Sequence, residues 1–200
     1  MASILAWVAQ SGVLQGIIIG GTLAFLTAVL IMNAVARAVT KTNNGWRVIR
    51  QCGQPANGVL VRAACAKALP VVNVFEEAAY WTTATDGSGQ TLAGRHEYIL
   101  RFPAGQLPPN DAFWSLTLTD VVGYMVNNPI NRSSIDDRSS LVKNADGSVD
   151  IYLQHNAPPG HGQNWLPSPP GKFKLMLRVY LPGAAILNDT YRVPHVVRTT

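Results

Sequence analysis

The N-terminal part of the sequence lacks charge. Residues 1–36 contain no Asp, Glu, Lys or Arg, and Arg37 is the first charged side chain. Within this part, Val13–Met32 is almost entirely apolar, and as a helix it would be about 30 Å long, enough to cross a hydrocarbon core. The pattern predicts a transmembrane anchor at 1–36, a juxtamembrane linker at 37–58 and a globular domain at 59–200.

A cleaved signal peptide is the alternative to a retained anchor. Ala34-Val35-Ala36 has the small-x-small pattern of a cleavage site. However, the segment has no basic residues before its apolar stretch, and that stretch exceeds the roughly 7–15 residues of a signal sequence. The sequence therefore favours a single-pass membrane protein.

Small residues recur at every fourth position of the predicted anchor. On a helix they form one stripe, which lets two backbones approach closely in lipid. The stripe predicts association with a second copy or with another membrane helix, although glycine and alanine are also simply common in spanning helices. Its members are Gly12, Gly16, Gly20, Ala24 and Ala28.

Cysteine is scarce, and the motifs built on it are missing. Cys52 and Cys65 are the two cysteines, without a Cys-x-x-Cys pair or a Cys–His cluster. These absences argue against a metal site, and nothing in the sequence indicates a cofactor. The two cysteines leave the compartment open, since a disulfide suits the oxidising side of a membrane and free thiols suit the cytosol.

Basic residues gather just after the apolar segment, ahead of the first acid, Glu76. Without an aromatic-rich basic repeat they indicate anionic lipid headgroups rather than nucleic acid. By the positive-inside rule they would place the globular part in the cytoplasm. They are Arg37, Lys41, Arg47, Arg50, Arg62 and Lys67.

The remainder of the chain alternates apolar and polar residues with a period of two. Trp114, Leu116 and Leu118, for example, fall on one face of a predicted strand at 112–120. Because no alternation of strands and helices appears, the pattern predicts an antiparallel sandwich or barrel. The other predicted strands are 80–85, 96–102, 149–154 and 172–181, with a short helix at 59–69.

Four sequence blocks resemble one known family. They are FPAGQLPPNDAFWSLTLTD (102–120), NPINRSSIDDRSSL (128–141), DGSVDIYLQH (146–155) and NWLPSPPGKFKLMLRVYLP (164–182). Together they are similar to the bacterial domain of unknown function 1214, in its form with one membrane helix before a single domain. The resemblance implies a jelly-roll-like β-sandwich and an extracytoplasmic envelope location, which opposes the positive-inside prediction. It implies no catalytic residues.

Asp120 and His155 each end an apolar row of a predicted strand. Ionisable groups at the edge of a core usually need a partner. If the two strands are neighbours, the side chains meet at a rim of the sandwich, where an Asp orienting a His makes a general base. Otherwise both strands simply end there in solvent.

The densest charged cluster has two interpretations. Arg132 and Arg138 could bind a carboxylate or a phosphate through paired hydrogen bonds. Asp136 and Asp137 could hold a cation through their carboxylate oxygens. Alternatively, the cluster, which begins at Asn131, pins a long connection by internal salt bridges.

Trp165 is equally open. Flanked by Asn164 and Pro167 across Leu166, it either stacks on a sugar ring or plugs one end of the sandwich.

No nucleophile motif is present, since Gly-x-Ser-x-Gly is missing. The sequence therefore favours a non-enzymatic envelope protein that binds an unidentified small molecule, saccharide or protein. The alternative is a jelly-roll enzyme acting on a small or saccharide-like substrate through His155 and Asp120.

Overall fold

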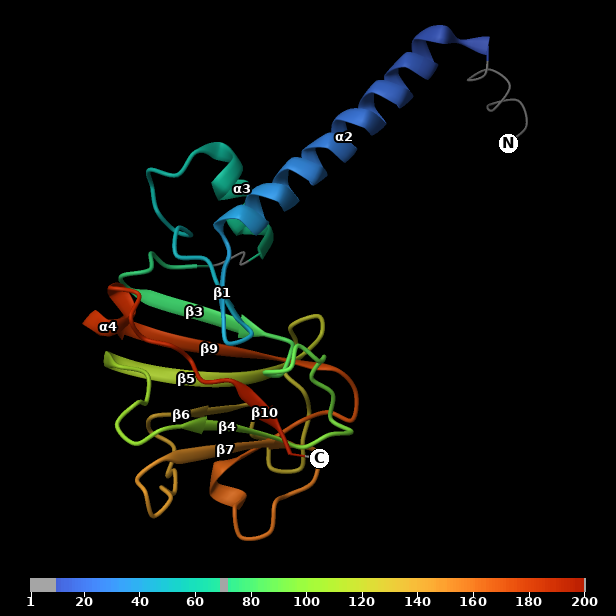
Figure 1. Ribbon diagram of the computed structural model, residues 1–200. Coiled ribbons are helices and arrows are strands. Elements are labelled where there is room, and N and C mark those ends of the chain that lie inside the picture. Colours follow the sequence, from blue (N-terminus) through green and yellow to red (C-terminus); the bar gives the residue numbers. More distant parts are fainter. Residues whose placement is uncertain (1–9, 69–71, 200) are drawn as a thin grey trace. The chain divides into compact units, whose positions relative to one another are not determined.

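The computed structural model describes residues 10–68 and 72–199 (Figure 1). They form two compact units. The first holds residues 10–39 and 55–68, and the second holds residues 40–54 and 72–199.

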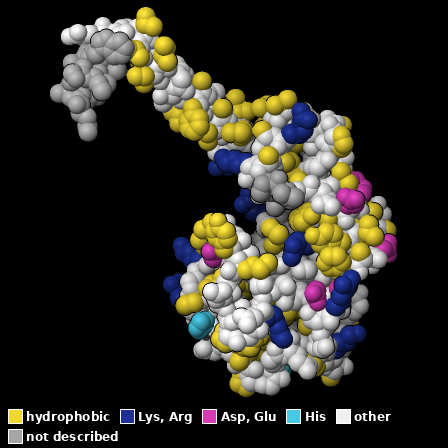
Figure 2. Space-filling view, turned by 180° about the vertical axis from the view of Figure 1, so that it is seen from behind, with side chains coloured by type: hydrophobic (Ala, Val, Ile, Leu, Met, Phe, Trp, Pro, Cys, Tyr) yellow, Lys and Arg dark blue, Asp and Glu magenta, His cyan; other side chains and the backbone are white. Residues whose placement is uncertain are grey.

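The first unit consists of two helices, α2 (Gly12–Val39) and α3 (Val59–Ala68). Helix α2 has no buried residue, and its most apolar window has a mean hydropathy of 2.1. By length and composition it is able to cross a membrane, and its apolar side chains lie open on its surface (Figure 2). Helix α3 contacts α2, and the Lys67 ammonium donates a hydrogen bond of 2.7 Å to Asn33 Oδ1.

The second unit contains two β-sheets. The larger sheet has the order β1 (Lys41–Asn43), β2 (Trp46–Val48), β3 (Ala78–Thr83), β9 (Phe173–Pro182), β5 (Asn110–Asp120) and β6 (Ser134–Asp136). The smaller sheet has the order β10 (Val196–Arg198), β4 (Tyr98–Phe102), β7 (Val149–Gln154) and β8 (Trp165–Pro167). The 3₁₀ helix η1 (Gly162–Asn164) precedes β8, and the short helix α4 (Ala184–Leu187) follows β9.

Both sheets contribute to one hydrophobic core. Leu116 of β5 pairs with Leu177 of β9, and both side chains are fully buried. Ile151 and Leu153 of β7 belong to the same core. The predicted mainly β fold with one N-terminal helix is confirmed, while the jelly-roll topology stays a prediction. Among the strands of residues 10–68 and 72–199, β7 and β8 pair in parallel and the other pairs are antiparallel.

The predicted linker at 37–58 differs from the structure. Helix α2 extends to Val39, and residues 41–48 form a hairpin that joins the larger sheet through β3. The predicted domain start at 59 also differs, since α3 belongs to the unit that contains α2. Three-residue strands are too short for a period-two pattern to stand out, so the sequence did not reveal them.

Cys52 and Cys65 are both disulfide-bonded. Their side chains are buried, with exposed fractions of 1% and 5%.

Replacing Leu177 with alanine tests the central position of β9. Because Leu177 is fully buried, Leu177→Ala is expected to lower the free energy of unfolding by about 2–5 kcal/mol. Met176→Ala, on the opposite face of the same strand, is the matched control and is expected to cost less than about 1 kcal/mol. The measurement is urea unfolding of the full chain in detergent, followed by tryptophan fluorescence. Equal losses in both variants would contradict the assigned faces.

Candidate ligand-binding pocket

A cavity of about 250 Å³ opens within the second unit, where the β1–β2 hairpin meets residues 186–193. We call it the Asp189 pocket. Its polar lining is Lys41, Thr42, Asn43, Arg50, Asp189 and Arg192. Its apolar lining is Trp46, Val48, Phe75, Trp81, Ile186, Tyr191 and Val193.

The hairpin is shaped by its turn and anchored by its tryptophan. Asn44 and Gly45 have φ values of 51° and 78°, the left-handed pair that a two-residue hairpin turn needs. The Asn44 side-chain amide donates to the Val193 carbonyl (3.0 Å), and Trp46 Nε1 donates to the Pro194 carbonyl (2.8 Å). The N-terminal hairpin of the unit is thereby joined to its C-terminal segment.

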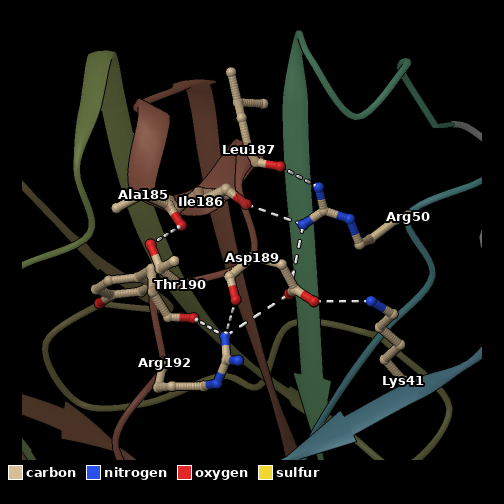
Figure 3. A network of polar contacts seen from close by, with 9 residues as sticks. Lys41, Arg50, Ala185, Ile186, Leu187, Asp189, Thr190 and Arg192 are labelled. Atoms are coloured by element: carbon tan, nitrogen blue, oxygen red, sulfur yellow. Dashed lines mark hydrogen bonds and ion pairs between the residues drawn. The ribbon is translucent and has the colours of Figure 1, made fainter.

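Asp189 stands between three cationic side chains (Figure 3). One of its carboxylate oxygens lies 2.8 Å from the Lys41 nitrogen, and the other lies 3.6 Å from Arg50 and 3.8 Å from Arg192. The hydrogen bond from Lys41 is the main reason that the pKa of Asp189 is below its ordinary value. The carboxylate is therefore charged at neutral pH.

Arg50 is held by carbonyl groups and by an aromatic ring. Its guanidinium donates to the Ile186 (2.9 Å) and Leu187 (2.5 Å) carbonyls at the end of α4. It also lies 4.1 Å from the centre of the Phe75 ring, a cation–π geometry. These contacts fix the cation at the wall of the pocket.

Arg192 uses one nitrogen for its hydrogen bonds. Nη1 donates to the Asp189 (2.6 Å) and Tyr191 (2.9 Å) carbonyls. With Lys41 and Arg50, it makes three cations around one carboxylate, which leaves two positive charges in excess among the groups that line the pocket. Burial raises the pKa of Tyr191, so its phenol stays neutral.

Sequence reasoning missed this pocket. Lys41 and Arg50 stood out as juxtamembrane bases, but Asp189 and Arg192 lie in no motif, and Lys41 and Asp189 are separated by 148 positions. The only local signals were the Asn44-Gly45 turn and a tryptophan within a polar segment.

A second cavity, of about 510 Å³, lies beside η1. His161 stacks on Tyr152 there, with ring centres 4.6 Å apart. Asn164 holds the wall by donating to the Val142 and Asp150 carbonyls, each at 2.8 Å. Arg132 Nη1 donates to the carbonyls of Gly162, Gln163 and Trp165 at 2.9–3.0 Å.

Asp120 and His155 do not form the predicted pair of neighbouring strand ends. Strand β5, which ends at Asp120, and strand β7, which precedes His155, lie in different sheets. The Asp120 carboxylate accepts backbone N–H bonds from residues 122–124, and His155 Nδ1 lies 2.9 Å from the Ser168 carbonyl oxygen. The premise that the two strands are neighbours was wrong, because strand order in space does not follow chain order.

The residues of the predicted charged cluster make local contacts around β6. The Arg138 guanidinium lies 5.4 Å from the centre of the Phe113 ring, and the Asp136 carboxylate accepts hydrogen bonds from the Arg138 N–H and the Ser139 hydroxyl. Asp137 donates its N–H to the Trp114 carbonyl (3.4 Å). Asn131 adopts a φ of 50° in the turn. Among the described residues no ion pair joins these side chains, so the predicted internal salt bridges are not formed. The ligand-binding interpretation of the cluster stays a prediction.

Trp165 does not present a stacking platform. Its side chain is buried, with 6% exposed, and its indole N–H donates to the Gln154 carbonyl (2.9 Å). The buried ring does not fit the stacking alternative and agrees with the alternative in which Trp165 plugs the sandwich. Within residues 10–68 and 72–199, no three His, Cys, Asp or Glu side chains are grouped as metal ligands.

Arg132→Ala tests whether Arg132 holds η1. Losing a charged donor shared by three carbonyls is expected to cost about 1–3 kcal/mol of unfolding free energy. The amides of residues 160–165 should also exchange faster with deuterium. Arg138→Ala is the matched control; it loses a surface cation–π contact and is expected to cost about 0.5–1 kcal/mol without faster exchange at 160–165. Unchanged exchange in Arg132→Ala would contradict the assignment.

Asp120→Asn tests the capped turn through its pH dependence. The N–H groups of Gly123, Tyr124 and Val122 lower the pKa of Asp120 below its ordinary value of 3.8, with Gly123 the largest cause. A lowered pKa in the folded state means that the charge stabilises the fold above pH 3.8 and that this gain is lost as pH falls through the folded pKa. We expect a lower Tm for Asp120→Asn at neutral pH and a difference that shrinks below pH 3.8. A difference independent of pH would contradict the role of the charge.

Comparison with known proteins finds a family but no activity. A family described as "Protein of unknown function (DUF1214)" matches residues 77–184. Among curated proteins there is no match. The crystal structure of the VPA0106 protein from Vibrio parahaemolyticus is similar, with 30% identity and a TM-score of 0.60 over 70% of this chain. The match covers only 35% of the Vibrio protein.

A crystal structure of an uncharacterized protein from Burkholderia cenocepacia is more distant, with 14% identity and a TM-score of 0.42. The match includes 92% of this chain and 51% of the Burkholderia protein. The family match spans more than half of the sequence, including strands β3, β4, β5, β6, β7, β8 and β9. The chain therefore belongs to the DUF1214 family of proteins of unknown function.

Proposed function

We propose that this protein is a single-pass membrane protein of the cell envelope whose β-sandwich binds a ligand in the Asp189 pocket outside the cytoplasm. The observation that carries the proposal is helix α2, which is long, apolar and without a single buried residue. A soluble helix with such a surface would expose its apolar side chains to water at a cost of about 25 cal/mol per Å². A bilayer removes that cost.

The oxidised cysteines support an extracytoplasmic location. Cys52 and Cys65 are both disulfide-bonded, and structural disulfides persist mainly in oxidising compartments. The basic residues after α2 argue for the opposite side. However, Lys41 pairs with Asp189, and Arg50 binds the end of α4. Their role in the pocket explains two of these charges without any role in membrane orientation.

The groups that line the pocket support binding rather than catalysis. Lys41, Arg50 and Arg192 surround a carboxylate that they already neutralise, and no nucleophile–base pair is found in this lining. The enzymatic alternative depended on Asp120 and His155, whose strands lie in different sheets. In the described part of the chain, no hydrogen bond or ion pair joins Asp120 to His155.

The small-residue stripe of α2 gives the proposal a partner within the bilayer. A Cβ added at Gly12, Gly16 or Gly20 would have no described atom within 4 Å apart from those of its chain neighbours and of the backbone of its own helix. This space suits close approach of a second helix, from another copy or another membrane protein.

Cysteine reporters on the two sides of α2 test the membrane orientation. Ser88→Cys places a thiol in an exposed loop of the second unit, and Ala2→Cys places one before the helix. An impermeant maleimide is expected to label Ser88→Cys in right-side-out membrane vesicles and Ala2→Cys only in inside-out vesicles. Retention in the membrane after alkaline extraction, together with an intact mass that includes Met1–Ala36, is expected for an uncleaved anchor.

Other labelling patterns have definite meanings. The reverse pattern would place the sandwich in the cytoplasm and overturn the envelope role. A mature protein beginning after Ala36 would identify the helix as a signal peptide and overturn the anchor.

A further inference from the structure

We infer that the Asp189 pocket binds an organic anion, a phosphate or carboxylate group carried on a small ring or apolar body, and that Asp189 is the internal counter-ion which this group replaces. The inference rests on the binding role proposed above and names the class of ligand.

The charge of the lining selects an anion. Three cations face one carboxylate, so Asp189 leaves two positive charges uncompensated. A neutral sugar would gain nothing from this excess. A phosphate or carboxylate gains charge-assisted hydrogen bonds, which are roughly twice as strong as neutral ones.

Of the three cations around it, Asp189 forms a side-chain hydrogen bond with Lys41 alone. Its 2.8 Å contact with Lys41 is a hydrogen bond, whereas Arg50 and Arg192 lie at 3.6 and 3.8 Å. Arg192 makes its hydrogen bonds through Nη1, and within the described part of the chain its Nε and Nη2 have none. A guanidinium edge of this kind matches the two oxygens of a carboxylate or phosphate.

The base of the pocket selects the rest of the ligand. Trp46, Phe75 and Trp81 close the base of the pocket and are each at most 8% exposed, so the half-buried Tyr191 is the aromatic ring with the most accessible surface there. Trp81 packs edge-on against both Phe75 and Tyr191. The volume of about 250 Å³ lies just below the roughly 300–1,000 Å³ of pockets for drug-sized ligands. The ligand body is therefore one ring or a short apolar chain.

A purely structural clamp is the competing explanation of the same contacts. In that case Asp189 only ties the hairpin to residues 186–193, and removing its charge weakens the fold without creating affinity for anything. A ligand site responds in the opposite way. Removing Asp189's charge frees Lys41, Arg50 and Arg192 and tightens anion binding.

The test is calorimetric titration of the full chain in neutral detergent with phenyl phosphate, inorganic phosphate and phenol. Phenyl phosphate is expected to bind about tenfold more tightly than inorganic phosphate, and phenol not measurably, since both the charge and the ring contribute. Arg192→Ala is expected to weaken phenyl phosphate binding by about tenfold or more. Asp189→Asn is expected to tighten it on the order of tenfold.

Three controls separate binding from net charge, from folding and from the shape of the guanidinium group. Arg95→Ala removes an exposed arginine outside the pocket lining and is expected to leave the affinity unchanged. Thermal unfolding of each variant establishes that it is folded. Arg192→Lys keeps the charge without the planar fork and is expected to bind with intermediate affinity.

The source of the anion is distinguished by a soluble short-chain phosphatidate. Tighter binding of this lipid than of phenyl phosphate would identify a lipid headgroup, and weaker binding would identify a free organic anion; either supports the site. Equal affinities of the parent protein and Arg192→Ala for both probes, with both proteins folded, would overturn the inference. The maleimide labelling does not depend on this result, so the membrane role and the ligand assignment are tested separately.

Discussion

Strand β9 is the element on which the second unit depends. It pairs along its length with β3 on one edge and with β5 on the other. The inner-face side chains Leu175, Leu177 and Val179 are completely buried. Strand β9 ends at Pro182, so its pairing with β3 and β5 also fixes the position at which the following segment, α4 and the residues up to 193, leaves the sheet. The position of the pocket's C-terminal wall is therefore a consequence of how the sheet is packed.

The N-terminal hairpin completes the pocket through polar contacts on an apolar base. Trp46 is 1% exposed, and its indole N–H is satisfied by the Pro194 carbonyl. Burying the apolar surface of a tryptophan stabilises the fold, but its indole N–H destabilises the fold if it is buried without a hydrogen-bond acceptor. This hairpin carries Lys41 to Asp189, and Arg50 lies two residues after its second strand, so a folding contact and a candidate binding site share the same segment.

Much of the fold was predictable because its long strands have a clear pattern. The strand predicted at 112–120 is β5 (Asn110–Asp120), and that predicted at 172–181 is β9 (Phe173–Pro182). The short strands β1, β2, β6 and β10 escaped prediction, since three residues carry too little periodicity. Strand β8 runs parallel to β7, so the sequence between them contains no hairpin turn that would indicate a second strand.

The sequence alone determined the apolar N-terminal helix, the alternating rows of the core and the membership of a family, because each depends on consecutive residues. Only the tertiary structure decided which polar groups meet. It separated Asp120 from His155 into different sheets, and it brought Lys41 to Asp189 across 148 positions. The physical reason is that hydrophobic periodicity is a local property of the chain, whereas strand order and ion pairs depend on how distant segments pack.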